Sequence, residues 1–423
     1  MKLASPKMAN TSVELRNAAL ANIGKALQEK QADIFAANRL DLTRAKEEGI
    51  SDAVYKRLKF DEGKLSGVIE GIQQLIGLAD PIGHVRLHRQ MDEGLTMKQI
   101  TCPIGVIGVI FEARPDALIQ ISTLCIKSGN CAILKGGKET RETNAVLFSI
   151  IKDACIASGL PEGCLLQVTA HNEIDELLQC EKDVDLLIPR GSNAFVQYIM
   201  NNTKIPVMGH ADGICHIYVD AAADLKQALS VIIDAKTQYT AACNAVETIL
   251  VHRSVAAEFL PQLASAFDAA GIHLRGTKEV LDITHSDGSY PQEDVMQEED
   301  FHKEYLDLIA SVKIVDSVEE AVDHINRFGS HHTDSILTTD DEAADYFLAM
   351  VDSAGVYRNI STRFADGFRY GFGAEVGIST SKLHARGPVG LDGLVTYKYQ
   401  IVGDGHIVGD YASGKRSFHF LDF

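Results

Sequence analysis

Cys243 stands in a setting that suits a nucleophile. It lies in the segment KTQYTAACNAVETILVH (236–252), where small residues precede it and Asn244 follows it. The apolar run 246–251 has the pattern of a β-strand, so the thiol occupies a polar turn between a helical pattern and a strand. Loops held by rigid elements commonly present nucleophiles. A cysteine among apolar side chains is more often inert packing, and the local sequence leaves both interpretations open.

Two further segments place ligand-binding residue types directly after short apolar runs. In ILKGGK (133–138), Lys135 would project from a buried strand end toward ribose hydroxyls or a phosphate. In IPRGSN (188–193), Gly191 allows close backbone approach, and Ser192 can cap a helix whose free amides favour an anion. A solvated lysine and a plain capped loop are the structural alternatives. Neither a G-x-G-x-x-G turn nor a P-loop occurs, which disfavours a standard dinucleotide turn and a kinase-type ATP site.

Charged residues gather after the longest apolar run, in FEARPDA (111–117). Arg114 could bind a carboxylate or phosphate through two parallel hydrogen bonds, with Glu112 beside it. The alternative is that both side chains pair with neighbours. Near the C-terminus, Arg386 in His384-Ala385-Arg386 is a further candidate cation for an anionic substrate.

A histidine-rich segment, AVDHINRFGSHHTDSI (321–336), is the other candidate for substrate contact. His331 and His332 lie among serine, threonine and aspartate, which suits a loop that grips a polar substrate. A merely structural loop is the alternative. The histidines lack the i, i+4 or H-E-x-x-H spacing of metal ligands, so we expect no metal site.

Length and composition describe a globular protein of two or three domains, because the chain has 423 residues, 46% hydrophobic and 23% charged. The net charge of −18 disfavours binding to nucleic acid or to anionic membranes, so an anionic substrate would meet locally placed cations. The eight cysteines are scattered, and no signal or transmembrane segment is evident. We therefore expect a soluble cytoplasmic protein with reduced thiols.

The pattern of elements predicts a first α/β domain over residues 1–235. Helical periodicity covers 11–78, and 83–101 alternates like an exposed hairpin that needs a partner surface. Unalternated apolar strands are then separated by helical stretches, which is typical of a parallel sheet covered on both faces. These expected strands are 104–111, 132–134, 165–168, 184–188 and 217–219.

A second α/β domain is expected over 236–370, and it would carry Cys243. Its expected strands are 248–251, 311–314, 334–338 and 355–358, and the acidic, Gly/Ser-containing segment 275–304 is expected to be a surface loop. Residues 371–423 would return to the first domain. Their Gly-broken strand pieces would pack with the 83–101 hairpin and form a small β flap for oligomerisation.

Six ordered blocks carry a resemblance that no single one would establish. They are PIGVIGVIFEARPDA (103–117), CAILKGGKE (131–139), LLIPRGS (186–192), GHADGICHIYVD (209–220), KTQYTAACNAVETILVH (236–252) and AVDHINRFGSHHTDSI (321–336). Together they resemble the γ-glutamyl phosphate reductase family, also called glutamate-5-semialdehyde dehydrogenases, of the aldehyde dehydrogenase superfamily. The similarity continues through 371–399 and covers essentially the whole chain.

The resemblance implies NADPH-dependent reduction of γ-glutamyl 5-phosphate to glutamate 5-semialdehyde and phosphate, the second step of proline synthesis from glutamate. Cys243 would be the nucleophile that carries a thioacyl group, with its own backbone amide or Asn244 as the oxyanion donor. Lys135 would contact the adenosine ribose and its 2′-phosphate, and Gly191 and Ser192 would lie near the cofactor phosphates. The implied fold is a nucleotide-binding domain, a catalytic domain and an oligomerisation flap, in a homo-oligomer coupled functionally to a glutamate 5-kinase.

Departures from the superfamily pattern sharpen this expectation. Ala113 stands where oxidising members carry an asparagine, and Gly209 falls where they carry the glutamate that activates water. The loss of that glutamate protects a thioacyl group from hydrolysis and favours a reductase. Phe328 stands where the narrower family leads us to expect histidine or tyrosine. A CoA-acylating aldehyde dehydrogenase and a nicotinamide-independent cysteine acyltransferase are the alternatives.

Overall fold

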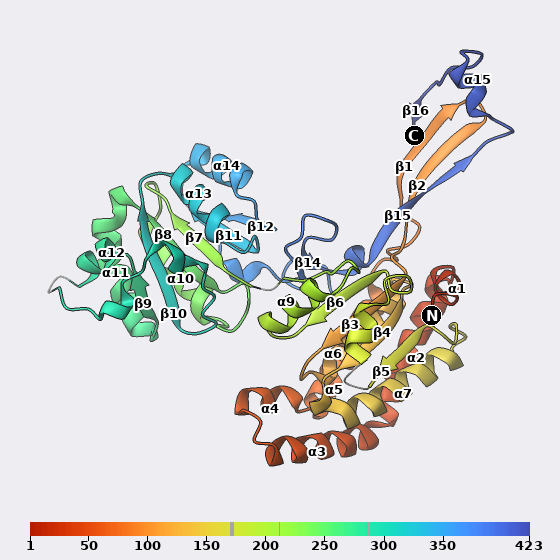
Figure 1. Ribbon diagram of the computed structural model, residues 1–423, viewed down its shortest axis with the longest axis horizontal. Helices are drawn as coiled ribbons and strands as arrows, with labels where there is room; N and C mark the ends of the chain where they lie inside the picture. The colour runs from red at the N-terminus through yellow and green to blue at the C-terminus, as the bar shows by residue number, and fades with distance from the viewer. Residues whose placement is uncertain (170–172, 211, 286–287) are drawn as a thin grey trace. The chain divides into compact units, whose positions relative to one another are not determined.

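The computed structural model describes residues 1–169, 173–210, 212–285 and 288–423 and is drawn in Figure 1. The chain divides into two compact units. The first comprises residues 1–209, 372–377 and 389–423, and the second comprises 210–371 and 378–388. Among the described residues, no helix has the length and apolar character needed to cross a membrane.

The first unit begins with amphipathic helices, as the 3.6-residue periodicity predicts. Ser12 and Asp61 cap two of them by accepting backbone N–H bonds from Leu15 and Lys64. The helices are α1 (Ser5–Ala9), α2 (Val13–Glu29), α3 (Gln31–Glu47), α4 (Asp52–Leu58) and α5 (Glu62–Gly77).

A four-stranded parallel sheet follows, in the order β5-β4-β3-β6. Its strands are β3 (Val106–Phe111), β4 (Cys131–Gly136), β5 (Leu165–Val168) and β6 (Leu186–Arg190). The connecting helices are α6 (Pro115–Lys127), α7 (Arg141–Ala157), α8 (Glu173–Leu178) and α9 (Asn193–Asn202). Phe111, at the end of the fully buried β3, pairs with Gly136 and Arg190, so the carboxyl ends of β3, β4 and β6 meet at one edge. This edge is where an open parallel sheet binds ligands.

A separate antiparallel sheet, which we call the flap, completes the first unit in the order β15-β2-β1-β16 (Figure 1). Its elements are β1 (Val85–Asp92), β2 (Leu95–Pro103), β15 (Val395–Val402), α15 (Val408–Ala412) and β16 (Leu421–Asp422). The C-terminal segment thus pairs with the 83–101 hairpin, as its strand pattern predicts. Beyond Val395 every residue of β15 is exposed, so the flap has little core of its own.

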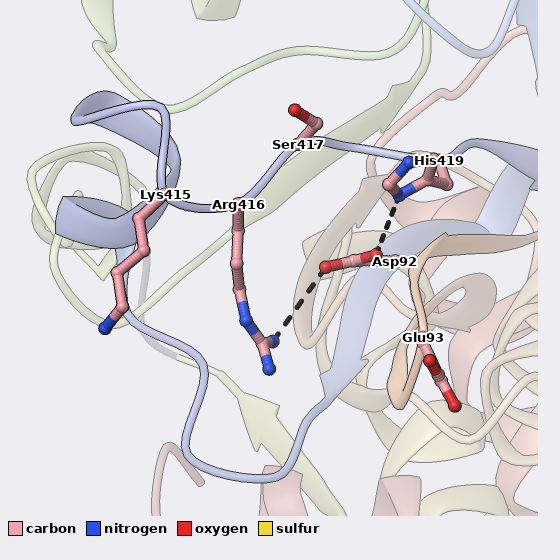
Figure 2. A pocket seen from close by; sticks show the side chains of 6 residues that line it. All are labelled: Asp92, Glu93, Lys415, Arg416, Ser417 and His419. Atoms are coloured by element: carbon pink, nitrogen blue, oxygen red, sulfur yellow. Dashed lines mark hydrogen bonds and ion pairs between the residues drawn. The ribbon is translucent and has the colours of Figure 1, made fainter.

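The flap holds a pocket of about 400 Å³ between its β1–β2 turn and the C-terminal segment, drawn in Figure 2. Asp92 is the centre of a charged cluster there. Hydrogen bonds from His419 and Tyr411 lower the pKa of Asp92 to about 2, and Arg416 lies 3.9 Å away. The pocket is lined by Asp92, Glu93, Lys415, Arg416, Ser417 and His419, and none of these is a candidate site residue.

The second unit is a six-stranded, wholly parallel sheet in the order β12-β11-β7-β8-β10-β9. Its strands are β7 (Cys215–Val219), β8 (Val246–His252), β9 (His273–Gly276), β10 (Ile309–Val315), β11 (Thr333–Leu337) and β12 (Gly355–Arg358). The helices are α10 (Leu225–Thr237), α11 (Arg253–Ala270), α12 (Lys278–Thr284), α13 (Val318–Phe328) and α14 (Asp341–Met350). Figure 1 shows α10 and α11 on one face and α13 and α14 on the other. Two apolar cores form there, because Ile217 and Val219 point to the first face and Tyr218 to the second.

Two sequence-based expectations differ from this architecture. Residues 217–219 were expected in the first sheet, with a boundary at residue 235, but β7 pairs with β8 and β11 and the division lies near Gly209. A buried parallel strand carries the same apolar pattern in either sheet, so its sequence does not reveal its partners. The prediction of a surface loop over 275–304 was wrong, because the described part of that segment contains α12 and two 3₁₀ turns, at Gln292–Asp294 and Glu298–His302.

Candidate active site

Cys243 lies in the turn that joins α10 to β8 in the second unit. Backbone bonds shape the turn: Ala242 N–H donates to Tyr239 O (3.2 Å), and Ala245 N–H donates to Ala242 O (2.9 Å). Gly213 packs directly against it, because a Cβ there would stand 2.1 Å from the Cys243 carbonyl oxygen. Only glycine fits so close to the turn, so the position of the cysteine depends on Gly213.

A buried ion pair joins the two elements that flank this turn. Lys236 lies near the end of α10 and Glu247 near the start of β8, and Lys236 Nζ is 2.8 Å from Glu247 Oε2. Both side chains are excluded from solvent. Burial raises the pKa of Glu247 to about 7 and lowers the pKa of Lys236. The pair holds both ends of the cysteine turn in register.

His332 is the partner of the Cys243 thiol. Its Nε2 lies 3.2 Å from Cys243 Sγ, and its Nδ1 lies 2.9 Å from the hydroxyl of Thr333, the first residue of β11. The ring is almost fully buried, while Cys243 is partly exposed. If Nδ1–H donates to Thr333, the lone pair of Nε2 faces the thiol, which is the arrangement of a base beside its nucleophile.

His210 completes the surroundings of the sulfur. Its ring meets that of His332 edge to face, with centroids 5.0 Å apart. Its Nδ1 lies 3.0 Å from the carbonyl oxygen of Ile378. The ligand atoms of His210, Cys243 and His332 all lie within 4.8 Å of one another. The thiol therefore faces two imidazoles.

Asn244 is buried and contacts the loop that follows β12. Its Nδ2 donates to Ala365 O (2.8 Å), and its backbone carbonyl accepts from Thr362 Oγ1 (2.7 Å). Its Oδ1 has no partner among the described residues. The oxyanion role named for Asn244 requires the second hydrogen of Nδ2, since the first is used by Ala365.

Arg363 brings a buried cation to the same neighbourhood. Its Nε donates to Gln238 Oε1 (2.9 Å), and its carbonyl accepts from Arg369 Nη1 (2.6 Å). Burial, followed by the charge of Arg369, lowers the pKa of Arg363, while a negative Cys243 sulfur acts in the opposite direction. The guanidinium of Arg363 is therefore a cation within electrostatic range of Cys243.

The other two expected substrate residues of this unit converge on Asp352. His331, with φ of +59°, has Nδ1 2.6 Å from the Asp352 carbonyl oxygen. Arg386 Nη2 donates to the carbonyl oxygen (3.1 Å) and to Oδ1 (3.2 Å) of the same residue. A hydrogen bond from Lys382, then one from Arg386, lowers the pKa of Asp352. His331 and Arg386 thus form one cluster, and their charges are partly balanced by Asp352.

The expected cofactor residues gather in the first unit, at the carboxyl edge of its sheet. Lys135 is buried at the end of β4, with Nζ 3.0 Å from Gly136 O. Ser192 immediately precedes α9, and its side chain makes no capping hydrogen bond, contrary to the expected cap. Its backbone N–H donates to Glu112 Oε2 (3.0 Å). A Cβ on Gly191 would meet that same carboxylate at 2.5 Å.

Two consequences follow for the sequence-based roles. Glu112, expected as a substrate contact, instead accepts a hydrogen bond from the Ser192 backbone N–H in the β6–α9 loop. That N–H is therefore not free to bind an anion. Arg114, at the start of α6, is exposed. Both residues belong to the first unit, whereas Cys243 belongs to the second.

Comparison with known proteins covers the whole chain. The model of the aldehyde dehydrogenase family matches residues 1–274. A γ-glutamyl phosphate reductase from Pelotomaculum thermopropionicum is 54% identical over 421 residues, which cover 99% of this chain and 95% of that protein. The chain belongs to the γ-glutamyl phosphate reductase family. This membership confirms the resemblance that the six sequence blocks carry.

Solved structures agree with this family and with the predicted fold class. The γ-glutamyl phosphate reductase of Thermotoga maritima superposes with a TM-score of 0.92 at 37% identity, over 96% of this chain and 97% of that one. An acetylating aldehyde dehydrogenase from Geobacillus thermoglucosidasius, 16% identical, has a TM-score of 0.63 over 96% and 95% of the two chains and agrees in fold alone. The aldehyde dehydrogenase-like α/β fold is therefore confirmed.

Sequence reasoning on this family member missed three of the groups around the thiol. His210 and Gly213 lie inside the block GHADGICHIYVD, whose glycine and histidine were available as a signal. Arg363 follows β12 in a segment with no distinctive motif. His332 was expected to touch substrate, but its contact with Cys243 joins residues 89 positions apart, which the sequence does not show.

Proposed function

We propose that this chain reduces γ-glutamyl 5-phosphate to glutamate 5-semialdehyde and phosphate with NADPH, through a thioacyl group on Cys243. The contact between Cys243 Sγ and His332 Nε2, at 3.2 Å, is the observation that carries the proposal. It gives the thiol an adjacent base in a turn fixed by Gly213. The family relationship over the full chain supplies the substrate class. The reaction is the second step of proline synthesis from glutamate.

The first half-reaction forms the thioester. His332 Nε2 accepts the thiol proton, and the resulting thiolate attacks the acyl carbon. A C–S bond forms, the C–O bond to phosphate breaks, and phosphate leaves with the bonding electron pair. The imidazolium of His332 can return its proton to the departing phosphate, which leaves His332 neutral for the next cycle. The cation of Arg363 favours the negative charge at the sulfur.

The second half-reaction releases the aldehyde. When bound, the reduced nicotinamide supplies the hydride that converts the acyl group to the aldehyde. The chain's contribution is to stabilise the oxyanion formed at the acyl oxygen, by the Cys243 amide or by the second Nδ2 hydrogen of Asn244. The C–S bond then breaks with its electron pair on the Cys243 sulfur, and a proton from solvent restores the thiol beside the neutral His332. Gly209, at the place of a water-activating glutamate, cannot promote the competing hydrolysis.

The residues at the carboxyl edge of the first sheet fit a nucleotide. Lys135 offers a cation at a buried strand end, and Gly191 leaves the backbone bare where a Cβ would collide with Glu112. We assign Lys135 to the adenosine ribose and its 2′-phosphate, with Gly191 and Ser192 near the cofactor phosphates. The backbone N–H of Ser192 already donates to Glu112, so we assign the phosphate contact to the Ser192 hydroxyl. Glu112 then positions this loop.

Cationic side chains named in the sequence analysis are candidates for binding the charged groups of the substrate. His331 and Arg386, joined through Asp352, are candidates for the α-carboxylate of glutamate. Arg114 is exposed and has no partner bond among the described contacts, so it retains its full capacity to bind a carboxylate or phosphate.

The reverse reaction tests the proposal directly. With glutamate 5-semialdehyde and NADP⁺, the protein should form NADPH over repeated turnovers only when inorganic phosphate is present. The Cys243→Ala variant should be inactive while its thermal unfolding stays that of the parent chain. Turnover that continues in Cys243→Ala would remove this cysteine from the mechanism.

The same assay separates the alternatives. A CoA-acylating aldehyde dehydrogenase would require CoA in place of phosphate. A nicotinamide-independent cysteine acyltransferase would show no NADPH binding in a fluorescence titration. The Cys243–His332 pair suits all three chemistries, so cosubstrate dependence decides among them.

We also propose that the chain acts as a homo-oligomer joined through the flap, in the cytoplasm. The support for assembly is β15, the terminal strand of its sheet, whose residues beyond Val395 are exposed. All eight cysteines are free thiols, as suits a reducing compartment. An acyl phosphate is reactive, so a kinase acting on the γ-carboxylate of glutamate must supply it, and functional coupling to that glutamate 5-kinase is part of the proposal.

A further inference from the structure

Two histidines and the reactive cysteine form a cluster with the chemistry of a metal site. Cys243 lies in the α10–β8 turn, His332 directly precedes β11, and His210 precedes β7. Their ligand atoms all lie within 4.8 Å of one another, and Cys243 Sγ and His332 Nε2 are already 3.2 Å apart. A tetrahedral zinc ion, with bonds of about 2.3 Å to sulfur and about 2.0 Å to nitrogen, holds its ligand atoms roughly 3.3–3.6 Å apart. A small movement of the His210 ring toward Cys243 and His332 would therefore bring all three ligand atoms to zinc-binding distances.

The hydrogen-bond contacts at Nδ1 of His210 and His332 leave Nε2 of each ring as the metal-ligand atom. His210 Nδ1 lies 3.0 Å from the carbonyl oxygen of Ile378, and His332 Nδ1 lies 2.9 Å from Thr333 Oγ1. Histidines that ligate metals usually donate their second ring N–H to an oxygen in this way, which fixes the tautomer and the ring orientation. Each histidine can therefore direct the lone pair of Nε2 toward the sulfur.

We propose that His210, Cys243 and His332 form an inhibitory binding site for Zn²⁺. One thiolate and two imidazoles select a thiophilic divalent ion over Mg²⁺ or Ca²⁺, which prefer oxygen ligands. On binding, the Cys243 S–H bond breaks, a Zn–S bond forms, and the proton passes to solvent. Coordination draws negative charge from the sulfur and crowds it, so the bound thiolate is a weaker nucleophile toward an acyl carbon. Binding is independent of the proposed function, whereas inhibition of turnover rests on it.

This metal site cannot be recognised from the sequence, because its ligands come from three separate segments. No pair among residues 210, 243 and 332 has a spacing used by metal-binding motifs, which is why sequence analysis predicts no metal. Only the parallel order β11-β7-β8 brings the three segments together at one edge of the second sheet.

Protection of the thiol tests the site without any assay of turnover. The full-length protein, stripped of metal, is treated with iodoacetamide in the presence or absence of Zn²⁺, and alkylation of the Cys243 peptide is followed by mass spectrometry. We expect Zn²⁺ to slow alkylation of Cys243 at least tenfold and a chelator to restore it. Co²⁺ in place of Zn²⁺ should produce the ultraviolet charge-transfer absorption of a cobalt–thiolate bond, at about one ion per chain.

Variants separate this site from adventitious binding. In His210→Ala, the Zn²⁺ concentration that protects Cys243 should rise by about 100-fold or more, because loss even of an outer partner of a ligand costs about 10- to 100-fold. His210→Gln serves the same purpose if the alanine variant unfolds. The control is His273→Ala, which removes a surface histidine paired with Asp294 and should leave protection unchanged.

The outcomes distinguish this inference from the proposed function. Unchanged alkylation of Cys243 with Zn²⁺, or equal protection in His210→Ala and the parent chain, would overturn the metal site even if the reductase is active. Protection and the cobalt band in a protein without reductase activity would support the site and contradict the proposed function. Where both hold, Zn²⁺ should inhibit turnover over the same concentration range that protects the thiol.

Discussion

At the scale of single residues, reactivity depends on what surrounds one sulfur atom. Cys243 is one of eight free cysteines, and five of the others are buried. Burial raises the pKa of thiols such as Cys125 and Cys131 to about 12 and leaves them protonated and inert. Cys243 differs because it is partly exposed and touches a histidine. The contact with His332, more than the cysteine itself, is what marks the site.

Replacing His332 should therefore impair the chemistry more than substrate binding. In His332→Asn we expect kcat to fall by about 100-fold or more, as is usual when a general base is removed, with a small change in KM. Alkylation of Cys243 by iodoacetamide should slow in parallel. His331→Ala, one position away, should alkylate like the parent chain. Equal alkylation of the parent chain and His332→Asn would contradict the role of His332.

Gly213→Ala tests how closely the turn is held. The added Cβ would stand 2.1 Å from the Cys243 carbonyl oxygen, so the turn must move. Displacement of a reacting group by about 1 Å can cost about 100-fold in rate, and we expect a loss of that order with a modest loss of stability. The matched control is Gly67→Ala in α5, where a Cβ meets nothing within 4 Å and activity should be unchanged. Near-normal activity in Gly213→Ala would show that the turn tolerates movement.

At the scale of elements, the cysteine turn depends on the ion pair between α10 and β8. Removing one member of a buried pair strands the other, so Lys236→Met should lower the free energy of unfolding by about 3–5 kcal/mol. The double variant Lys236→Met/Glu247→Leu should recover most of that loss, since it leaves no unpaired buried charge. Chemical denaturation of the single and double variants measures both effects. Equal destabilisation in the two would show that packing, not charge, is responsible.

The same pair predicts a pH dependence with a defined sign. The folded-state pKa of Glu247 is about 7, above its ordinary value of 4.5, so the folded chain binds a proton more tightly than the unfolded chain does. The contribution to stability is complete below about pH 4.5 and is lost as the pH rises through about 7. The free energy of unfolding of the parent chain relative to Glu247→Gln should fall over this window and stay level above it. A difference that does not vary with pH would contradict the raised pKa.

Most elements were predictable because local patterns determine them. Helical periodicity and continuous apolar runs located α2, α5, β3, β5 and β8 within a few residues. The sheet that each strand joins was not predictable for β7, because pairing depends on side chains far along the chain. The site shows the same limit. Strand-end motifs place Lys135, Gly191 and Ser192 at the ends of β4 and β6, and their cofactor role stays a prediction, whereas the contact of His210 with His332 arises only from tertiary packing.

At the scale of the whole molecule, each unit contains its own parallel sheet, and the flap of the first unit has little core of its own. Tyr399, Ile401 and Val402 on β15 are 55%, 56% and 68% exposed, which is costly for apolar side chains unless another copy covers them. Tyr399→Ser/Ile401→Ser should therefore lower the oligomer mass measured by light scattering, while Leu3→Ser, a 91%-exposed residue outside the flap, should not. An unchanged mass in the β15 variant would exclude this strand from the interface.

The most direct test of the account is to trap the acyl group on its residue. When phosphate is withheld, NADP⁺ and glutamate 5-semialdehyde should give a burst of about one NADPH per chain and then stop, since the thioester has no acceptor. Peptide mass spectrometry should find the glutamyl group on Cys243, and added phosphate should remove it and restart turnover. An acyl group on another residue, or steady turnover without any adduct, would contradict covalent catalysis by Cys243.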